Sequence, residues 1–216
     1  MAITLATGTQ VAIASTYGTQ FTVTAITNAN PAVATLSASH GVVVGDFIEL
    51  TSGWDLLNGR IVRVSALSTN DATLEGINTT STTNYPAGSG TGTGREITAW
   101  TSVTQIQSIE TSGGDINFAD ITTVADSTQK QIPTTRSPQQ INMTVFDDPA
   151  LAWFAVAQAA SDAKVVTGMR IIFANASRVL LNGYLSVQKV PTVAVNEPLT
   201  AVLGFSASAE ATRYST

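Results

Sequence analysis

Strict alternation of apolar and small polar side chains near the C-terminal end is the feature that most limits the fold of this chain. In residues 199–210 the odd positions are alanines or the larger apolar residues Leu199, Leu203 and Phe205. The even positions include Thr200, Ser206, Ser208 and Glu210. Because successive side chains of a β-strand point to opposite faces, this segment predicts a strand with one buried and one solvated face. Such strands are typical of antiparallel sheets.

Residues 179–189 repeat the pattern and predict a second strand of the same kind. Its apolar positions are Leu181, Leu185 and Val187, and its polar positions are Asn182, Tyr184, Ser186 and Gln188. Ile141, Met143 and Val145 mark a third strand. Residues 168–184 predict a hairpin that turns at 175–177, and residues 190–198, with prolines and Asn-Glu, predict a connection.

One helix is expected, at about residues 148–161. Asp147 or Asp148 is the expected N-cap and Pro149 the first helical residue, followed by strong helix formers. The expected buried stripe comprises Leu151, Phe154 and Ala155, with Trp153 and Val156 beside it. An acidic metal site at the aspartate pair is the alternative, but capping accounts for the pair without a metal.

Residues 21–95 differ from the rest because their strands are short and glycines or Asn-Gly pairs punctuate them. This spacing predicts a small barrel-like β-domain inserted into a larger domain made of residues 1–20 and 96–216. The alternative is that these strands extend the main sheet. The Gly-, Ser- and Thr-rich residues 84–96 predict a linker or surface loop.

Residues 112–137 carry apolar side chains that share no periodic face. Unstructured loops longer than about 12–15 residues are uncommon and usually functional. We therefore expect a long loop whose apolar groups find partners on another molecule, although an ordinary surface loop is the alternative.

Charge is scarce and late in the sequence. Only 12% of the residues are charged, and the first is Asp46. Isolated monomers usually need more surface charge to stay apart. The composition thus favours a surface covered by other subunits, whereas the alternative is a monomer with threonine on exposed strand faces. The net charge of -5 argues against a nucleic-acid-binding surface.

No catalytic, cofactor or metal constellation is expected. The chain has no cysteine and a single histidine, His40, without a neighbouring acid or nucleophile in sequence. The glycine-rich run lacks the Lys-Ser/Thr and helix that a phosphate loop needs. Neither a signal peptide nor a membrane span is expected, so the sequence predicts a soluble protein of a reducing cytoplasm, and a secreted carbohydrate-binding domain has little support.

Five segments in order resemble the tail tube proteins of long-tailed, non-contractile bacteriophages, in a subgroup with an inserted small β-domain. They are "TAITNANPAVATLSASHGVVVGDFIEL", "SGWDLLNGRIVRV", "KQIPTTRS", "MTVFDDPALAWF" and the closing "TRY". The resemblance implies an all-β antiparallel sandwich or barrel with one flanking helix. It also implies a virion protein with no enzymatic activity, assembled in the host cytoplasm.

In such proteins hexameric rings stack helically around a channel that DNA crosses in transit, without specific binding. Expected partners are other copies of the chain, the tape measure protein, the tail terminator and the distal tail protein, with no membrane. Residues 112–137 would be the inter-ring loop and residues 1–18 an N-terminal arm. The expected inter-ring contacts are Ile116, Phe118, Ile121, Val124, Ile132, Pro133 and Arg136.

The polar face of the two C-terminal strands is the expected channel lining. Its predicted members are Asn182, Tyr184, Ser186, Gln188, Thr200, Ser206, Ser208 and Glu210. A lining almost free of positive charge would let DNA slide, because a basic one would hold its phosphates. The alternative functions are other ring-forming phage proteins: a tail terminator, a head-tail connector or a capsid decoration protein.

Overall fold

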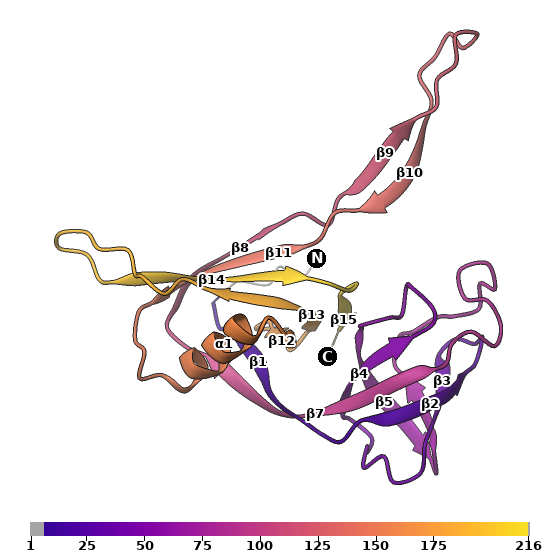
Figure 1. Ribbon diagram of the computed structural model, residues 1–216, viewed down its shortest axis with the longest axis horizontal. Coiled ribbons are helices and arrows are strands. Elements are labelled where there is room, and N and C mark those ends of the chain that lie inside the picture. The colour runs from indigo at the N-terminus through magenta and orange to yellow at the C-terminus, as the bar shows by residue number, and fades with distance from the viewer. Residues whose placement is uncertain (1–6, 216) are drawn as a thin grey trace.

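A computed structural model describes residues 7–215 of the chain (Figure 1). Thirteen of its strands join into one antiparallel sheet, in the order β2-β3-β6-β5-β4-β7-β1-β12-β13-β14-β11-β8, with β15 beside β13. The remaining strands, β9 and β10, form a separate two-stranded ribbon. The fold is therefore all-β with a single helix in the described part, as the alternation of the sequence predicts.

The C-terminal half of the sheet encloses one apolar core. Its strands are β1 (Gln10–Tyr17), β8 (Ile106–Ser112), β11 (Gln140–Phe146), β12 (Val166–Ile172), β13 (Arg178–Val187) and β14 (Thr200–Ala207). Most of the predicted apolar positions, such as Met143, Leu203 and Phe205, are buried in this core. Two differ, because Val187 is only partly buried and Leu199 is 43% exposed. The predicted hairpin is also confirmed, because Phe173 donates to the carbonyl of Ser177 across the turn between β12 and β13.

The helix α1 (Ala152–Ala163) begins later than predicted. Its N-cap is Leu151, which makes no side-chain capping hydrogen bond. The Asp148 carboxylate instead accepts a hydrogen bond from the Ala150 amide, in the turn before the helix. Pro149 is correspondingly in a turn. The predicted stripe is corrected as well: Trp153 and Ala157 are the buried residues, and Ala155 is exposed. The aspartate thus shapes the turn that leads into the helix.

The N-terminal half has its own core. Its short strands are β2 (Phe21–Ile26), β3 (Ala32–Leu36), β4 (Phe47–Ser52), β5 (Ile61–Ser68) and β6 (Asp71–Leu74). The predicted linker is partly wrong, because β7 (Gly92–Val103) begins inside the glycine-rich run. A Cβ at Gly92 would lie 2.1 Å from the Thr51 carbonyl oxygen, and one at Gly94 would lie 2.5 Å from the Phe21 ring. These glycines let β7 pack closely between β2 and β4.

Both halves share β7 and a third apolar cluster. The cluster brings Phe47 and Ile61 of the N-terminal half against Ala14, Ile97, Leu180 and Tyr214. Tyr214 lies on β15 (Thr212–Tyr214), and its hydroxyl accepts a 2.7 Å hydrogen bond from the Arg63 amide. The division into an inserted domain at 21–95 and a larger domain remains a prediction, and this shared cluster is what excision of 21–95 would expose.

The predicted N-terminal arm is wrong for residues 10–17. They form β1, a central strand between β7 and β12, and Val11, Ala12, Ile13 and Ala14 on it are buried. The low charge of this stretch therefore reflects burial in its own subunit. Residues 1–6 of the predicted arm lie outside the described residues.

The predicted long loop at 112–137 is in fact a hairpin. The strands β9 (Ile116–Asp120) and β10 (Gln131–Arg136) pair with each other and project away from the rest of the molecule (Figure 1). At its base, Gly114 donates to Ser137 and Ser137 donates to Asp115. We call this hairpin, residues 115–137, the arm.

The free energy of unfolding at high pH should depend on Tyr214, which is buried in the apolar cluster shared by the two halves. Burial raises the pKa of Tyr214 to about 12 from an ordinary value of 10.0. Between these values the unfolded chain has released the phenol proton and the folded chain has kept it, so the free energy of unfolding falls as the pH rises. The loss should reach about 2–3 kcal/mol near pH 12.

Urea unfolding between pH 8 and pH 11.5 would measure this slope. Tyr214→Phe should reduce it without abolishing it, because burial also raises the pKa of Tyr17. The control Tyr184→Phe, which removes a half-exposed tyrosine, should leave it unchanged. Equal slopes in Tyr214→Phe and the unmodified chain would contradict the assignment.

Candidate assembly interface

Four neighbouring strands present a continuous polar face on the side opposite the core. Cross-strand registers align Glu110 with Asn142, Asn142 with Gly204, and Gly204 with Ser186. Rows above and below this one repeat the arrangement on β8, β11, β14 and β13. We call the whole set the polar face: Ser108, Glu110, Ser112, Gln140, Asn142, Thr144, Tyr184, Ser186, Gln188, Val202, Gly204 and Ser206.

The polar face is almost uncharged. Glu110 is its single charged residue, and no lysine or arginine belongs to it. Its hydroxyl and amide side chains project from this face of the sheet and can hydrogen-bond with water. The valine among them, Val202, is flanked by Gln188, whose Oε1 accepts from the Val202 amide. The surface is therefore hydrophilic and presents no cation to a phosphate group.

The structure places the predicted lining residues unevenly. Tyr184, Ser186, Gln188 and Ser206 lie on the polar face, and Thr200 lies half-buried at its edge, where it pairs with Phe146. Ser208 is exposed just beyond β14, and its hydroxyl donates to the Asn182 carbonyl.

Two predicted lining residues differ from expectation. Asn182 is wrong as a lining residue, because it is 1% exposed and donates through Nδ2 to the Gly59 carbonyl at 2.9 Å. The turn at 58–60 of the N-terminal half covers that end of β13. Glu210 is exposed but lies 3.5 Å from Arg60 and 3.9 Å from Arg136, so neighbouring cations offset its charge.

Sequence reasoning missed the part of the polar face that β8 and β11 contribute. The available signal was the alternation of Gln140, Asn142 and Thr144 with the apolar residues between them. The prediction used only the apolar residues of this strand, Ile141, Met143 and Val145. The partner strand β8 alternates weakly, because Ile106 and Ile109 are three residues apart.

Strand β8 ends the sheet and leaves one edge unpaired among residues 7–215. An exposed edge presents a row of free N–H and C=O groups that can pair with another chain. At the other side of the same four strands, β12 pairs with β13 only as far as Tyr184. The last residues of β13 therefore have β14 on one side and no strand on the other among the described residues.

The arm holds all of the predicted inter-ring residues, and they are exposed. Phe118 is 59% exposed and Val124 fully so. The others are Ile116, Ile121, Ile132, Pro133 and Arg136. Phe118 pairs with Pro133, and Ala119 pairs with Ile132, so apolar groups lie on both faces of the ribbon.

That two-sided arrangement explains why the sequence shows no periodic face. A lone two-stranded hairpin is marginally stable in water, and this one has no core beneath it. Turn hydrogen bonds fix its tip: Asp120 accepts from Thr122, and Asp126 accepts from Thr123 and pairs with Lys130. The pKa of the Asp126 carboxyl is lowered by these contacts, first by Lys130. The arm is thus shaped locally but belongs to no apolar core cluster of residues 7–215.

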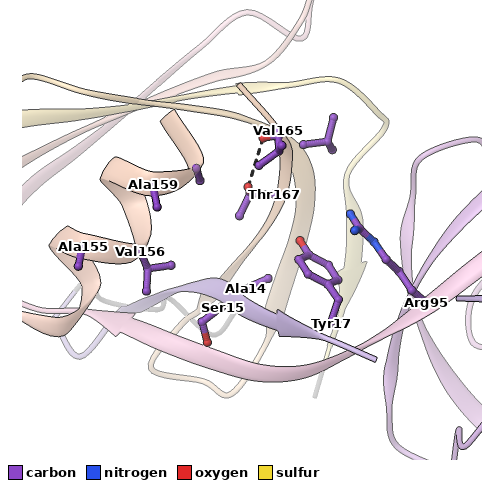
Figure 2. Close-up of a pocket in the computed structure, with 11 residues that line it drawn as sticks. Ala14, Ser15, Tyr17, Arg95, Ala155, Val156, Ala159, Val165 and Thr167 are labelled. Atoms are coloured by element: carbon purple, nitrogen blue, oxygen red, sulfur yellow. Dashed lines mark hydrogen bonds between the residues drawn. The ribbon is translucent and has the colours of Figure 1, made fainter. Parts of the chain in front are cut away.

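A cavity of about 780 Å³ opens between α1 and strands β1 and β7 (Figure 2). Its tyrosine and its arginine are already engaged. The Tyr17 hydroxyl accepts a 2.9 Å hydrogen bond from the Gly168 amide, and burial raises the pKa of Tyr17. Arg95 stacks on the Tyr17 ring at 3.8 Å and pairs with Glu49 at 2.8 Å. The lining offers no nucleophile with a base beside it.

The described residues form neither a metal site nor a membrane-spanning helix. Within residues 7–215 no three histidine, cysteine or acidic side chains gather as metal ligands. In the same part of the chain no helix is long and apolar enough to cross a membrane. His40 is structural, because its Nδ1 accepts from the Val42 amide at 3.0 Å.

Comparison with known proteins adds one match. The sequence model of a family described as "Phage tail tube protein, TTP" matches residues 52–216. The matched part includes the polar face, the arm and α1. No curated protein matches the chain.

Truncating Phe118 should cost the isolated subunit little, because its ring contacts no core. Phe118→Ala should change the free energy of unfolding by less than about 0.5 kcal/mol. The same substitution at Phe205, which is 3% exposed, should lower it by about 3–5 kcal/mol. Guanidinium unfolding followed by tryptophan fluorescence measures both. Comparable losses would show that the arm packs within its own subunit.

Proposed function

Because the chain belongs to the phage tail tube protein family, we propose that it forms hexameric rings that stack helically into a hollow tube crossed by genomic DNA. The family establishes a structural role in a phage tail. The ring size comes from the resemblance of its sequence to tail tube proteins, whereas the features of the subunit support ring closure, stacking and passage of DNA.

Ring closure is supported by the unpaired edge of β8 and by the end of β13, where no described strand pairs and the Val187 amide donates to the Ser161 hydroxyl of α1. Strand β8 could pair with the open end of β13 in a neighbouring copy, so that the sheets continue from subunit to subunit. Such a contact is head-to-tail, and a head-to-tail contact generates a closed ring when its rotation closes. The polar faces would then form one lining.

The observation that carries the proposal is the composition of the polar face. A surface of hydroxyls and amides with one carboxylate and no cation gives DNA phosphates nothing to bind. Six copies of Glu110 would line each ring and repel the passing DNA weakly. Serines, glycine and small amides also leave the wall free of bulky side chains, apart from Tyr184.

Stacking is supported by the arm. It projects beyond the body of the subunit with uncovered apolar groups on both faces, and burial of each large side chain against another ring would contribute about 1.5–3 kcal/mol. Contacts repeated around a ring would add up. In the assembled tail the tape measure protein, the tail terminator and the distal tail protein would be further partners, with assembly in the host cytoplasm.

Negative-stain electron microscopy of the purified chain tests the proposed function. We expect open-ended hollow filaments with a regular ring repeat. Discrete single rings that do not elongate would favour a tail terminator or connector, and a monomer at high concentration would contradict assembly altogether.

Removal of the arm should stop elongation without unfolding the subunit. Ser137 donates to the Asp115 carbonyl at 2.9 Å, so residues 116–136 can be replaced by Gly-Gly to leave a tight two-residue turn. We expect an unchanged melting transition, because no arm residue belongs to a core cluster, and no filaments by microscopy. Normal tubes from this variant would contradict the stacking role.

Charge reversal on the polar face should slow DNA passage. Glu110→Lys would place six ammonium groups in each ring, where DNA must displace counterions to leave. Ejection from phage particles built with this variant should be roughly tenfold slower at low salt and recover as salt is raised. Asp55→Lys, the same charge change at an exposed residue of the N-terminal half, is the control. Equal ejection rates for the two variants would place Glu110 outside the channel.

A further inference from the structure

The connection between β13 and β14, residues 188–199, gathers exposed valines. Val193 is 75% exposed and Val195 is 90% exposed. Val190 and Leu199 in the same connection are also exposed. We call this segment the valine loop. Exposed apolar groups gathered in one place usually mark an interaction site.

The valine loop is held in place but not covered. Thr192 and Thr200 exchange backbone hydrogen bonds at its base, Glu197 donates to Ala194 within it, and Lys189 pairs with Asp162 on α1 at 2.7 Å. None of its valines belongs to a core cluster of the described residues. The loop therefore has a defined position and an apolar surface that no core cluster of the described part of the subunit covers.

The sheet register places the valine loop and the arm at opposite ends of the same strands. The arm leaves β8 and β11 where Gln140 aligns with Ser112 and Ser206. The valine loop enters β14 where Thr200 aligns with Phe146, at the other end of β11. Figure 1 shows the two projecting in opposite directions from the body of the molecule.

Strands of a closed barrel are inclined by about 35–45° to its axis, so their two ends lie at the two rims. In a stack of identical rings, the upper rim of one ring faces the lower rim of the next. The arm of one copy would thus arrive at the rim that carries the valine loop of another. We propose that the valine loop is the receptor for the arm of a second copy in the adjacent ring, an inference that rests on the proposed tube.

The chemistry of the two segments agrees with this pairing. Each offers large apolar side chains and lacks a partner, and a contact between them would cover Val193 and Val195 together with Phe118 and its neighbours. Charge is compatible with this contact. Glu197 of the loop has no ionic partner among the described residues, and Arg136 at the base of the arm keeps 58% of its side chain exposed although it also lies 3.9 Å from Glu210. The same contact would repeat at every ring junction.

Acidic substitution tests the receptor. In the double variant Val193→Asp/Val195→Asp, each new carboxylate would be buried against the arm, so tubes should be lost or shortened at least about tenfold in length while the melting transition is retained. The matched control is Val43→Asp/Val44→Asp, because these valines are also exposed, at 58% and 59%, but lie in the N-terminal half. The control should form normal tubes.

The outcomes separate the two proposals. Normal tubes from Val193→Asp/Val195→Asp would overturn the receptor alone, and so would equal losses in the two double variants. Failure of the unmodified chain to form tubes would overturn the proposed function and this inference with it.

A cross-linking measurement keeps the inference testable if the acidic variant does not fold. The natural chain has no cysteine, so Val193→Cys and Phe118→Cys variants can be mixed, assembled and mildly oxidised. We expect a disulfide-linked heterodimer from tubes and none from dispersed subunits. The control pair, Val43→Cys with Phe118→Cys, should not cross-link. Tubes that yield no heterodimer from Val193→Cys, or from Val195→Cys in its place, would overturn the contact.

Discussion

An unpaired strand edge is the constraint on which the rest of this structure depends. Strand β8 carries backbone donors and acceptors along its free side, and soluble monomers usually protect such an edge with charge, proline or a covering segment. Here the residues of β8 include only Glu110 as a charged group, and no proline. The proposed pairing with another copy would satisfy the edge, and the arrangement of the other surfaces would follow from that pairing.

If the sheet continues through the edge, its two faces become inside and outside for the whole ring. The core side is closed by α1 and the apolar residues of the curled sheet, so the polar face is left to the channel. This explains how a chain with 12% charged residues can be stable. In the proposed tube, much of its uncharged surface would face either another subunit or a bore in which cations would hold DNA.

Alternation along single strands allowed the C-terminal sheet and most of its buried residues to be predicted. A strand with one buried and one solvated face has apolar and polar residues at alternate positions. Strand β1 could not be recognised in the same way. It lies buried at the centre of the sheet, and a strand covered on both faces loses its alternation. The strands of the arm were not predicted for the opposite reason. Both faces of this uncovered ribbon carry apolar groups, so its sequence does not alternate either.

Other departures came from tertiary contacts that a local pattern does not contain. The glycines at the start of β7 read as a linker, although they are required by the close approach of Thr51 and Phe21. Asn182 has the correct parity for the polar face but is covered by the turn at Gly59. The helix α1 begins later than predicted because the Asp148 carboxylate accepts a hydrogen bond from the Ala150 amide in the turn before the helix. In each case the chemical property assigned to the residue was correct, but its predicted position in the fold was wrong.

Amide hydrogen exchange at β8 tests the central claim most directly. In dispersed subunits the outward amides of residues 106–112 should exchange as rapidly as those of an open edge, and in assembled filaments they should become protected to the level of the interior strand β11. If those amides exchange equally fast in both forms, or are already protected in the free chain, the sheets do not continue from subunit to subunit and the account is contradicted.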